Sequence, residues 1–334
     1  MKDLYNLHKF YNNGKSSKQL NNRRKSFGYQ VLGFGSGVVA AVAGNDNGIF
    51  GFGTTGGTNR SAMTNLVSNV GVLATDVSGV GTARRLPAAT QYGGDKGIFG
   101  FGYTSSGPTV NTAVSNLVSN VGVVASDVTG VGTARRGVAA CSYGGDKGIF
   151  AYGSTTAAYV SMSNLVSNAG VIASDVTGVG TVRYIQAAVE YGTDKGLFAY
   201  GYGGGGWPTV TNLVSNVGVI ADDNSVAGTS RQHPGGCDYG GDKGIIAYGY
   251  NSVAGGISVS NLVSNSGVVS SDVTGVGTAG DALAACEYGQ DKGIFAYARG
   301  PSNDRNLVSN VGVISDDATG AGTARSSLAA CSYN

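Results

Sequence analysis

Five arginines recur in the sequence, each in the motif Gly-Thr-x-Arg and each eight residues after an aspartate. A guanidinium forms an ion pair with a carboxylate of its own chain, or it binds a carboxylate or sulfate of a ligand through two parallel hydrogen bonds. The spacing predicts an ion pair across a short hairpin within each repeat. The alternative is a ring of arginines that binds an anionic ligand, such as a sulfated or acidic glycan. The arginines are Arg84, Arg135, Arg183, Arg231 and Arg325, and Gly280 replaces the sixth.

Asp-Lys-Gly is a second recurring motif. An aspartate side chain hydrogen-bonds backbone amides in tight turns, and glycine adopts the positive φ that such turns need. We therefore expect a turn at each copy. The alternative, a ring of acidic groups that binds a cation, lacks the remaining ligands of a calcium loop, so neither a metal nor a cofactor is expected. The copies begin at Asp95, Asp146, Asp194, Asp242 and Asp291, with Asp46-Asn47-Gly48 as an altered first copy.

Catalytic residues are not expected. The two histidines, His8 and His233, belong to no repeated motif, so no nucleophile and base recur together. Glu190, Asp238 and Glu287 each precede an equivalent tyrosine in three successive repeats. Two carboxylates that face each other are the arrangement of glycoside hydrolases, and this alternative stays open. The prediction is a protein that is not an enzyme.

These motifs lie in a repeat that occurs six times between residues 45 and 334. Asn-Leu-Val-Ser-Asn marks each copy, at intervals of 45 to 51 residues. Glycine accounts for 58 of 334 residues, which disfavours helices. Repeats of this length are typical of propeller blades. The sequence predicts an all-β fold, a six-bladed β-propeller of four-stranded antiparallel blades, or seven blades if a partial blade at either end is counted.

Within one repeat, four strands are expected over 149–152, 160–166, 171–173 and 181–191. The last of these contains small residues, as in Ala187-Ala188-Val189, which fit a crowded centre, so we predict that it is the innermost strand. The looser copy at 38–43 or the last copy at 329–333 completes a blade begun by the other end of the chain. The four cysteines occupy one position of this strand, where Thr90 and Val189 stand in other repeats, and are expected to be structural.

Charge divides the chain into two regions. Residues 1–26 contain seven basic residues and one acidic residue, whereas the remainder contains 15 basic and 19 acidic residues. We predict a basic N-terminal arm over 1–37, which attaches to a partner or is flexible, and a repeat domain over 38–334. Arg23, Arg24 and Lys25 are the candidate attachment residues, although nucleic acid is not the expected partner. No apolar run is long enough for membrane insertion.

One loop in each repeat varies in length and composition, while the other connections are constant. Variable loops on a constant scaffold commonly form binding surfaces. Aromatic residues in these loops are therefore the candidate ligand or partner contacts. They are Tyr103, Tyr159, Trp207, Pro208 and Tyr250, where the proline accompanies the tryptophan.

The repeats resemble the kelch-like propeller repeats of bacteriophage structural and tail-fibre proteins. The resemblance rests on Tyr143–Gly153, Ser163–Asn168 and Gly130–Arg135 and extends over residues 38–334. It implies a virion component, located in the virion, that contacts other virion proteins through its arm and displays its loops for assembly or for receptor binding on host surface glycans, alone or as a homo-oligomer. Kelch blades each carry a tryptophan, whereas Trp207 is the only one here. The alternative function is a carbohydrate-binding propeller lectin independent of a virus.

Overall fold

The computed structural model describes residues 45–334 except 57–58, 105–109 and 301. These residues belong to one compact unit, Ala43–Asn334. The predicted arm over 1–37, with Arg23, Arg24 and Lys25, and its boundary with the repeats lie outside the described residues.

The described part of the chain is all-β, as predicted, and it contains no helix. Its strands form six antiparallel sheets, numbered here in the order in which their second strands occur in the chain, and one short hairpin. Sheet 1 contains β21 (Ala329–Tyr333), β1 (Asn47–Gly51) and β4 (Thr64–Val67); sheet 2 contains β5 (Ala88–Tyr92), β6 (Lys96–Thr104) and β7 (Val110–Val118); sheet 3 contains β8 (Ala139–Tyr143), β9 (Lys147–Ala151) and β10 (Ser163–Val166).

The remaining strands continue the same pattern. Sheet 4 contains β11 (Ala187–Tyr191), β12 (Lys195–Ala199), β13 (Val210–Val214) and β14 (Asn224–Ser225); sheet 5 contains β15 (Gly235–Tyr239), β16 (Lys243–Asn251) and β17 (Gly255–Val263); sheet 6 contains β18 (Ala284–Tyr288), β19 (Lys292–Ala298) and β20 (Ser302–Val308). The hairpin is β2 (Thr54–Thr55) with β3 (Asn59–Arg60).

The predicted number of strands was wrong for five of these six sheets, which have three strands within the described residues. The segment expected to form the third strand of its repeat, 171–173, joins β10 only through the single bridge between Val166 and Ile172. Its backbone is held by a side chain instead, because Asn164 Nδ2 donates to the Ala173 carbonyl at 3.0 Å. One asparagine per repeat therefore replaces part of a strand ladder.

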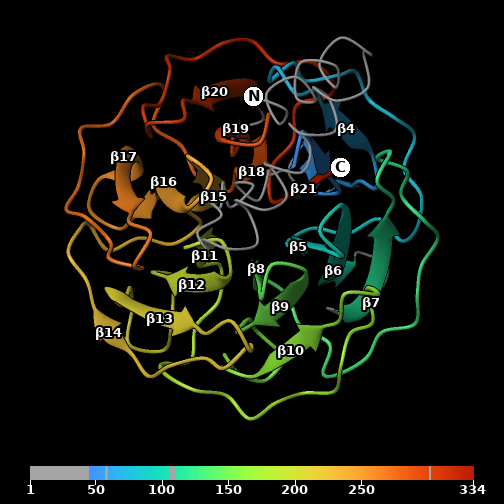
Figure 1. Ribbon diagram of the computed structural model, residues 1–334, viewed down its shortest axis with the longest axis horizontal. Helices are drawn as coiled ribbons and strands as arrows, with labels where there is room; N and C mark the ends of the chain where they lie inside the picture. Colours follow the sequence, from blue (N-terminus) through green and yellow to red (C-terminus); the bar gives the residue numbers. More distant parts are fainter. Residues whose placement is uncertain (1–44, 57–58, 105–109, 301) are drawn as a thin grey trace, which may run out of the picture. The chain divides into compact units, whose positions relative to one another are not determined.

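The innermost strand was assigned correctly, but to the wrong sheet. Ala187–Tyr191 pairs with the strand that follows it, β12, so it is the first strand of sheet 4 and not the last strand of sheet 3. The six first strands contact one another in the order β5, β8, β11, β15, β18 and β21, and β21 contacts β5. Figure 1 shows the sheets arranged around these strands.

Sheet 1 is built from both ends of the described chain. β1 pairs with β21 in antiparallel register, with Asn47 opposite Tyr333 and Gly51 opposite Ala329. Of the two segments expected to complete a blade, the copy at 329–333 does so. The two elements farthest apart in the sequence are thus neighbours in one sheet.

The hydrophobic core is divided among the seams between adjacent sheets. Each of its six clusters combines buried residues of two sheets, as where Tyr152 of sheet 3 packs on Phe198 of sheet 4 with ring centroids 5.3 Å apart. The cysteines lie in these seams. Cys141 faces Gly196 of the next sheet, and burial raises the pKa of its thiol well above the usual value, so it is a packing group.

We predict that Gly196→Ala destabilises the domain by about 1–3 kcal/mol, because the added methyl group would overlap the Cys141 Sγ. The double variant Gly196→Ala with Cys141→Ala provides the space and should recover part of this loss. Urea unfolding of the two single variants and the double variant measures the coupling. If the losses in unfolding free energy of the two single variants simply add in the double variant, the predicted contact between Gly196 and Cys141 would be contradicted.

Candidate ligand-binding site

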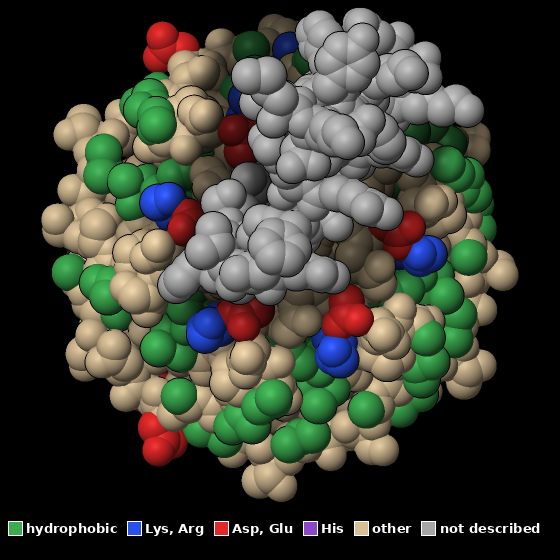
Figure 2. Space-filling view, in the orientation of Figure 1, with side chains coloured by type: hydrophobic (Ala, Val, Ile, Leu, Met, Phe, Trp, Pro, Cys, Tyr) green, Lys and Arg blue, Asp and Glu red, His purple; other side chains and the backbone are tan. Residues whose placement is uncertain are grey.

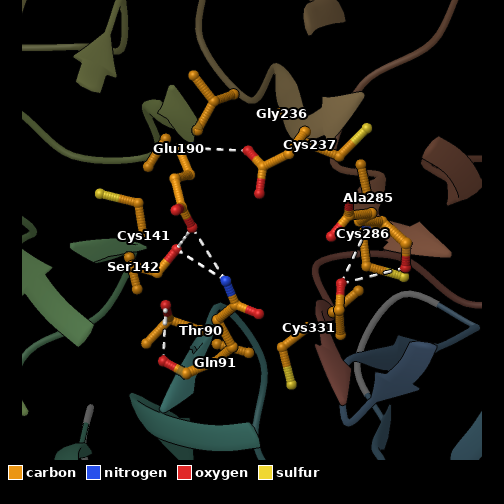
Figure 3. A pocket seen from close by; sticks show the side chains of 18 residues that line it. Thr90, Gln91, Cys141, Ser142, Glu190, Gly236, Cys237, Ala285, Cys286 and Cys331 are labelled. Atoms are coloured by element: carbon orange, nitrogen blue, oxygen red, sulfur yellow. Dashed lines mark hydrogen bonds between the residues drawn. The ribbon is translucent and has the colours of Figure 1, made fainter. Parts of the chain in front are cut away.

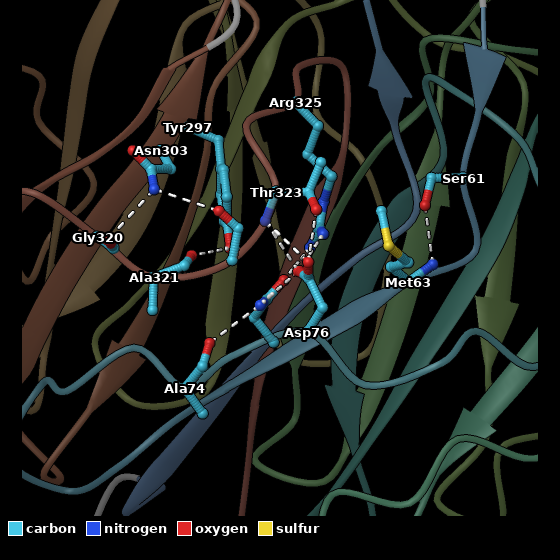
Figure 4. A network of polar contacts seen from close by, with 12 residues as sticks. Ser61, Met63, Ala74, Asp76, Tyr297, Asn303, Gly320, Ala321, Thr323 and Arg325 are labelled. Carbon is cyan, nitrogen blue, oxygen red and sulfur yellow. Dashed lines mark hydrogen bonds and ion pairs between the residues drawn. The ribbon is translucent and has the colours of Figure 1, made fainter.

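The recurring arginines are buried between neighbouring sheets. Arg325, which precedes β21 of sheet 1, lies with its guanidinium carbon 4.7 Å from the ring centroid of Tyr297 in sheet 6. Its guanidinium hydrogen-bonds Asn65 of β4 and lies 3.5 Å from the Asp76 carboxylate. Figure 4 shows Arg325 and Thr323 beside Asp76. The Asp76 carboxylate also accepts hydrogen bonds from the Thr323 amide and hydroxyl at 2.9 and 2.6 Å. Each interaction joins segments that are distant in the sequence.

The predicted ion pair within each hairpin was wrong. Arg183 lies 3.8 Å from Asp223 and Arg135 lies 3.3 Å from Asp175, whereas the aspartate eight residues before each arginine belongs to the preceding sheet. The cause is the assignment of the innermost strand. An arginine just before that strand belongs to the sheet that follows, and it meets the asparagine and aspartate of that sheet.

The alternative of an arginine ring open to an anionic ligand is also not supported. Arg84, Arg135, Arg183, Arg231 and Arg325 are all 0% exposed, and aromatic rings and amide oxygens surround their guanidinium groups. Burial lowers the pKa of Arg84 to about 10, and the Asp127 charge opposes this shift, so the group keeps its positive charge at neutral pH. These arginines connect sheets.

The residue after each buried arginine points away from the seam, because side chains alternate along an extended chain. Arg85, Arg136 and Tyr184 therefore line a cavity of about 630 Å³, with backbone bridges from Arg85 to Tyr103 and from Tyr184 to Tyr202 holding two of them in place. The complete lining is Thr54, Arg85, Leu86, Tyr103, Arg136, Tyr184, His233, Arg299, Ser326 and Ser327. We call it the arginine–tyrosine cavity.

Positive charge is poorly compensated in this cavity. In the described part of the chain, neither Arg85 nor Arg136 has a carboxylate within 4.0 Å. Their guanidinium carbons lie 4.9 and 5.3 Å from the centroid of the Tyr103 ring, and that of Arg60 lies at 4.9 Å. Burial and the charge of Arg60 lower the pKa of Arg85. Such a site attracts an anionic group.

His233 contributes a neutral polar group to the same cavity. Burial, followed by the positive charges of Arg299 and Arg85, lowers its pKa to about 3. The imidazole is therefore uncharged at neutral pH, where it offers one hydrogen-bond donor and one acceptor.

A cluster of aromatic side chains adjoins the cavity at Tyr184. The rings of Tyr159 and Tyr184 are stacked with centroids 4.8 Å apart, and Tyr202 meets Tyr184 at 6.0 Å and Trp207 at 5.2 Å. Trp207, a candidate contact residue, thus also packs within the protein, against Tyr202. The Trp207 Nε1 atom is buried and has no hydrogen-bond partner in the part of the chain that the structure describes.

The predicted contact residues are distributed unevenly. Tyr103 lines the cavity, and Tyr159 and Trp207 belong to the aromatic cluster, whereas Pro208 and Tyr250 are half-buried and do not line the cavity. The role of all five predicted contact residues in binding stays a prediction. Sequence reasoning missed Arg85, Arg136, Tyr184, His233 and Arg299. The doublets Arg84-Arg85 and Arg135-Arg136 could have identified the second arginine as a cavity residue, because only one arginine of each pair fits between two sheets.

A second, smaller cavity lies among the six first strands. It is about 70 Å³ in volume and contains the three acidic residues Glu190, Asp238 and Glu287. Figure 3 shows that Gln91 and Ser142 point toward Glu190, whose carboxylate accepts hydrogen bonds from both. The Asp238 carboxylate accepts a hydrogen bond from the Glu190 amide at 2.7 Å. This volume has room for water molecules but not for a sugar ring.

Burial dominates the electrostatics of this central cavity. It raises the pKa of Glu190 to about 7, against the opposing hydrogen bonds from Ser142 and Gln91. Burial and the charge of Glu190 raise the pKa of Asp238 well above its usual value, and burial with the charge of Asp238 does the same for Glu287. The protonation of each of the three carboxyls thus depends on that of the others.

The aspartate of each Asp-Lys-Gly motif lies in the turn between first and second strands, as expected, but its lysine and glycine begin the second strand, as in β9. The expected positive φ at the motif glycine was wrong, because the left-handed residues precede the aspartate, as at Gly144 and Gly145. Asp146 pairs with its neighbour Lys147 at 2.6 Å and accepts a hydrogen bond from Asn168 at 3.1 Å. Figure 2 shows basic and acidic side chains side by side near the centre of this face. Within residues 45–334, apart from the undescribed positions, no three histidine, cysteine or acidic side chains gather in a manner that would hold a metal ion.

Comparisons with known proteins give no assignment. No family model matches the chain, and no curated protein matches it. Among the described residues, no helix is long and apolar enough to span a membrane.

We predict that the stability of the domain falls as the pH rises through the range of the Glu190 titration. The pKa of Glu190 is raised to about 7 in the folded state, so the folded protein binds more protons than the unfolded chain. This contribution is complete below about pH 4.5, the usual value for glutamate, and is lost as the pH rises through about 7.

Glu190→Gln should remove part of this pH dependence and stabilise the domain at about pH 8, by on the order of 1–3 kcal/mol. Urea unfolding at about pH 5 and pH 8 measures the effect, with Asp222→Asn at an exposed site as the control. Equal pH dependence in wild type and Glu190→Gln would contradict the assignment.

Proposed function

We propose that residues 45–334 form a six-bladed β-propeller in which each of the six sheets is one blade. The successive contacts of the first strands, and the contact of β21 with β5, support this arrangement. The pairing of β21 with β1 supports closure of the ring through sheet 1.

We propose that this protein is a non-enzymatic recognition protein whose arginine–tyrosine cavity binds an acidic carbohydrate. One observation carries the proposal: Arg85 and Arg136, with no carboxylate partner among the described residues, share a cavity of about 630 Å³ with half-buried tyrosines. A cavity of this size accommodates a small ligand such as one or two sugar rings.

The chemistry of the cavity suits a sugar that carries a carboxylate or sulfate. The planar guanidinium groups of Arg85 and Arg136 bind such an anion through paired hydrogen bonds. The ring of Tyr103 offers an apolar surface beside a polar edge, which matches the two faces of a sugar. Neutral His233, Thr54 and Ser326 supply uncharged groups for sugar hydroxyls.

We also propose the virion as the setting of this recognition. The resemblance of the repeats to those of bacteriophage structural and tail-fibre proteins supports this setting. The N-terminal arm would attach the protein to other virion proteins, and the cavity would recognise an acidic glycan on the host surface. Several rings on one particle would add their weak affinities through a high effective concentration.

The binding proposal predicts that the protein retains sulfated or carboxylated glycans on a glycan array and that Arg85→Ala with Arg136→Ala weakens this binding roughly tenfold or more. The control is Lys147→Ala with Lys195→Ala, which removes the same charge from the Asp–Lys turns. Equal losses in both variants would reveal attraction by net charge alone. If the wild-type protein retains no acidic glycan, the proposal fails.

The virion setting predicts that mass spectrometry of purified phage particles from the source detects peptides of this chain. Lysate proteins of similar abundance, followed through the same purification, provide the control for carry-over. Glycan binding without any trace of the protein in particles would favour the alternative, a propeller lectin independent of a virus.

A further inference from the structure

We propose that a cavity beside Gly280 is a binding site for a guanidinium group. Gly280 stands where five other repeats carry the buried arginine, and a cavity of about 220 Å³ lies at this position. Arg299 is the one lining residue that this cavity shares with the arginine–tyrosine cavity, and the inference does not depend on carbohydrate binding.

The five arginines define what a guanidinium requires at this position. In each repeat it lies over an aromatic ring of the preceding sheet, at 3.9 to 4.7 Å, and hydrogen-bonds the asparagine that begins Asn-Leu-Val-Ser-Asn. Arg231, for example, donates from Nη2 to Asn261 Oδ1 at 2.7 Å and from Nη1 to the Thr229 carbonyl at 3.0 Å. Figure 4 shows the equivalent arrangement around Arg325.

Every one of these partners is present beside Gly280. Asn306, Asp317, Thr278 and Tyr248 line the cavity and correspond to Asn261, Asp272, Thr229 and Tyr200 around Arg231. Asn306 Nδ2 donates to Asp317 Oδ1 at 2.8 Å, and Thr278 Oγ1 donates to Asp317 Oδ2 at 2.6 Å, as in the other repeats. The frame that holds a guanidinium is therefore intact without an arginine of its own.

One acceptor in this frame, Asn306 Oδ1, is left without a donor among the described residues. Asn306 is 7% exposed, whereas its five equivalents are 0% exposed. Hydrogen bonds from Thr278 and Asn306 outweigh burial and lower the pKa of Asp317, so its negative charge persists at neutral pH. An amide oxygen and a carboxylate in a small cavity favour a cation.

The arginine that lines this cavity, Arg299, does not occupy the guanidinium position. Arg299 forms an ion pair with the buried carboxylate of Asp281 at 2.9 Å, and its own side chain is 54% exposed. The preferred cation is planar. In four of the other repeats one nitrogen reaches the asparagine and a second reaches the threonine carbonyl, and in all five the guanidinium lies over the ring. A guanidinium meets these three demands, whereas an ammonium group does not.

The ligand would occupy the space that the arginine side chain takes in the other repeats. A Cβ atom built on Gly280 would have Ala298 Cβ at 3.4 Å as its nearest neighbour, and Gly280 does not have a left-handed backbone conformation. An arginine at this position is therefore sterically acceptable, and Gly280→Arg should fill the site from within. The same space admits the side chain of free arginine or of an arginine residue in a partner protein.

Isothermal titration with methylguanidinium tests the site, with methylammonium as the matched cation. We expect one site with a millimolar dissociation constant for methylguanidinium, at least tenfold weaker binding of methylammonium, and loss of the site in Gly280→Arg. Gly280→Arg should also raise the melting temperature, as a bound ligand does. No saturable binding by wild type, or equal binding by Gly280→Arg, would overturn the proposal.

Two further variants keep the test decisive if Gly280→Arg does not fold. Asn306→Leu should abolish methylguanidinium binding, and Arg183→Gly should open an equivalent cavity and raise the stoichiometry from one to two. An unchanged stoichiometry in folded Arg183→Gly, or unchanged binding in folded Asn306→Leu, would contradict the proposal.

The source of the guanidinium is distinguished by two ligands. Free L-arginine that binds as well as methylguanidinium identifies the amino acid as a sufficient ligand. Tighter binding of a blocked peptide, acetyl-Gly-Arg-Gly-amide, than of L-arginine identifies an arginine side chain of a partner protein. Either result supports the site, and failure of both ligands alongside methylguanidinium overturns its assignment to arginine.

Discussion

The structure depends on a guanidinium held between two sheets. An arginine before five of the six first strands, as at Arg183, rests on an aromatic ring of the preceding sheet and hydrogen-bonds an asparagine of its own sheet. A buried charge is costly unless its partners are correctly placed, so this interaction stabilises only one relative position of the two sheets. The apolar seams supply burial, and the arginines fix the register between sheets.

The aromatic residue of each seam has an otherwise unfavourable backbone conformation. The ring beneath each of the five guanidinium groups belongs to a residue in the left-handed region, with φ between 59 and 67° at Phe52, Phe101, Tyr152, Tyr200 and Tyr297. Tyr248, the equivalent residue beside Gly280, has φ 62°. Such a conformation costs about 1–3 kcal/mol in a residue other than glycine. The left-handed conformation interrupts the alternation of side chains along the strand, so the ring points into the seam between sheets. The residue that follows each buried arginine is not part of this contact, and its type differs from repeat to repeat. Arg85, Arg136 and Tyr184 are three such residues, and they line the cavity.

The sequence contained most of the architecture. The repeats, the all-β class and the small-residue strand at the centre were predictable, because periodicity and side-chain volume are local properties. The partners of Arg84 and Arg183 were not predictable from spacing, since they depend on which sheet the strand at 187–191 joins. That pairing is decided by the turn at Asp194, between Tyr191 and Lys195, whereas the sequence permits either division of the repeat.

The candidate site was predictable only in part for the same reason. Aromatic loop residues such as Tyr103 were identified from loop variability, but Arg85 and Arg136 were hidden beside arginines of a different role. In each Arg-Arg doublet of the repeats the first arginine is buried between sheets, and the second arginine lines the cavity. The convergence of these residues on one cavity requires the relative positions of several sheets, which no local pattern supplies.

The shared construction of sheet 1 determines how this domain emerges during synthesis. β1 is translated first but lacks its neighbour β21 until residue 333 has left the ribosome. For most of translation, one long edge of β1 presents unpaired amides and carbonyls, which is a template for pairing with another nascent chain. Completion of sheet 1 therefore waits for the synthesis of β21, nearly 300 residues after β1.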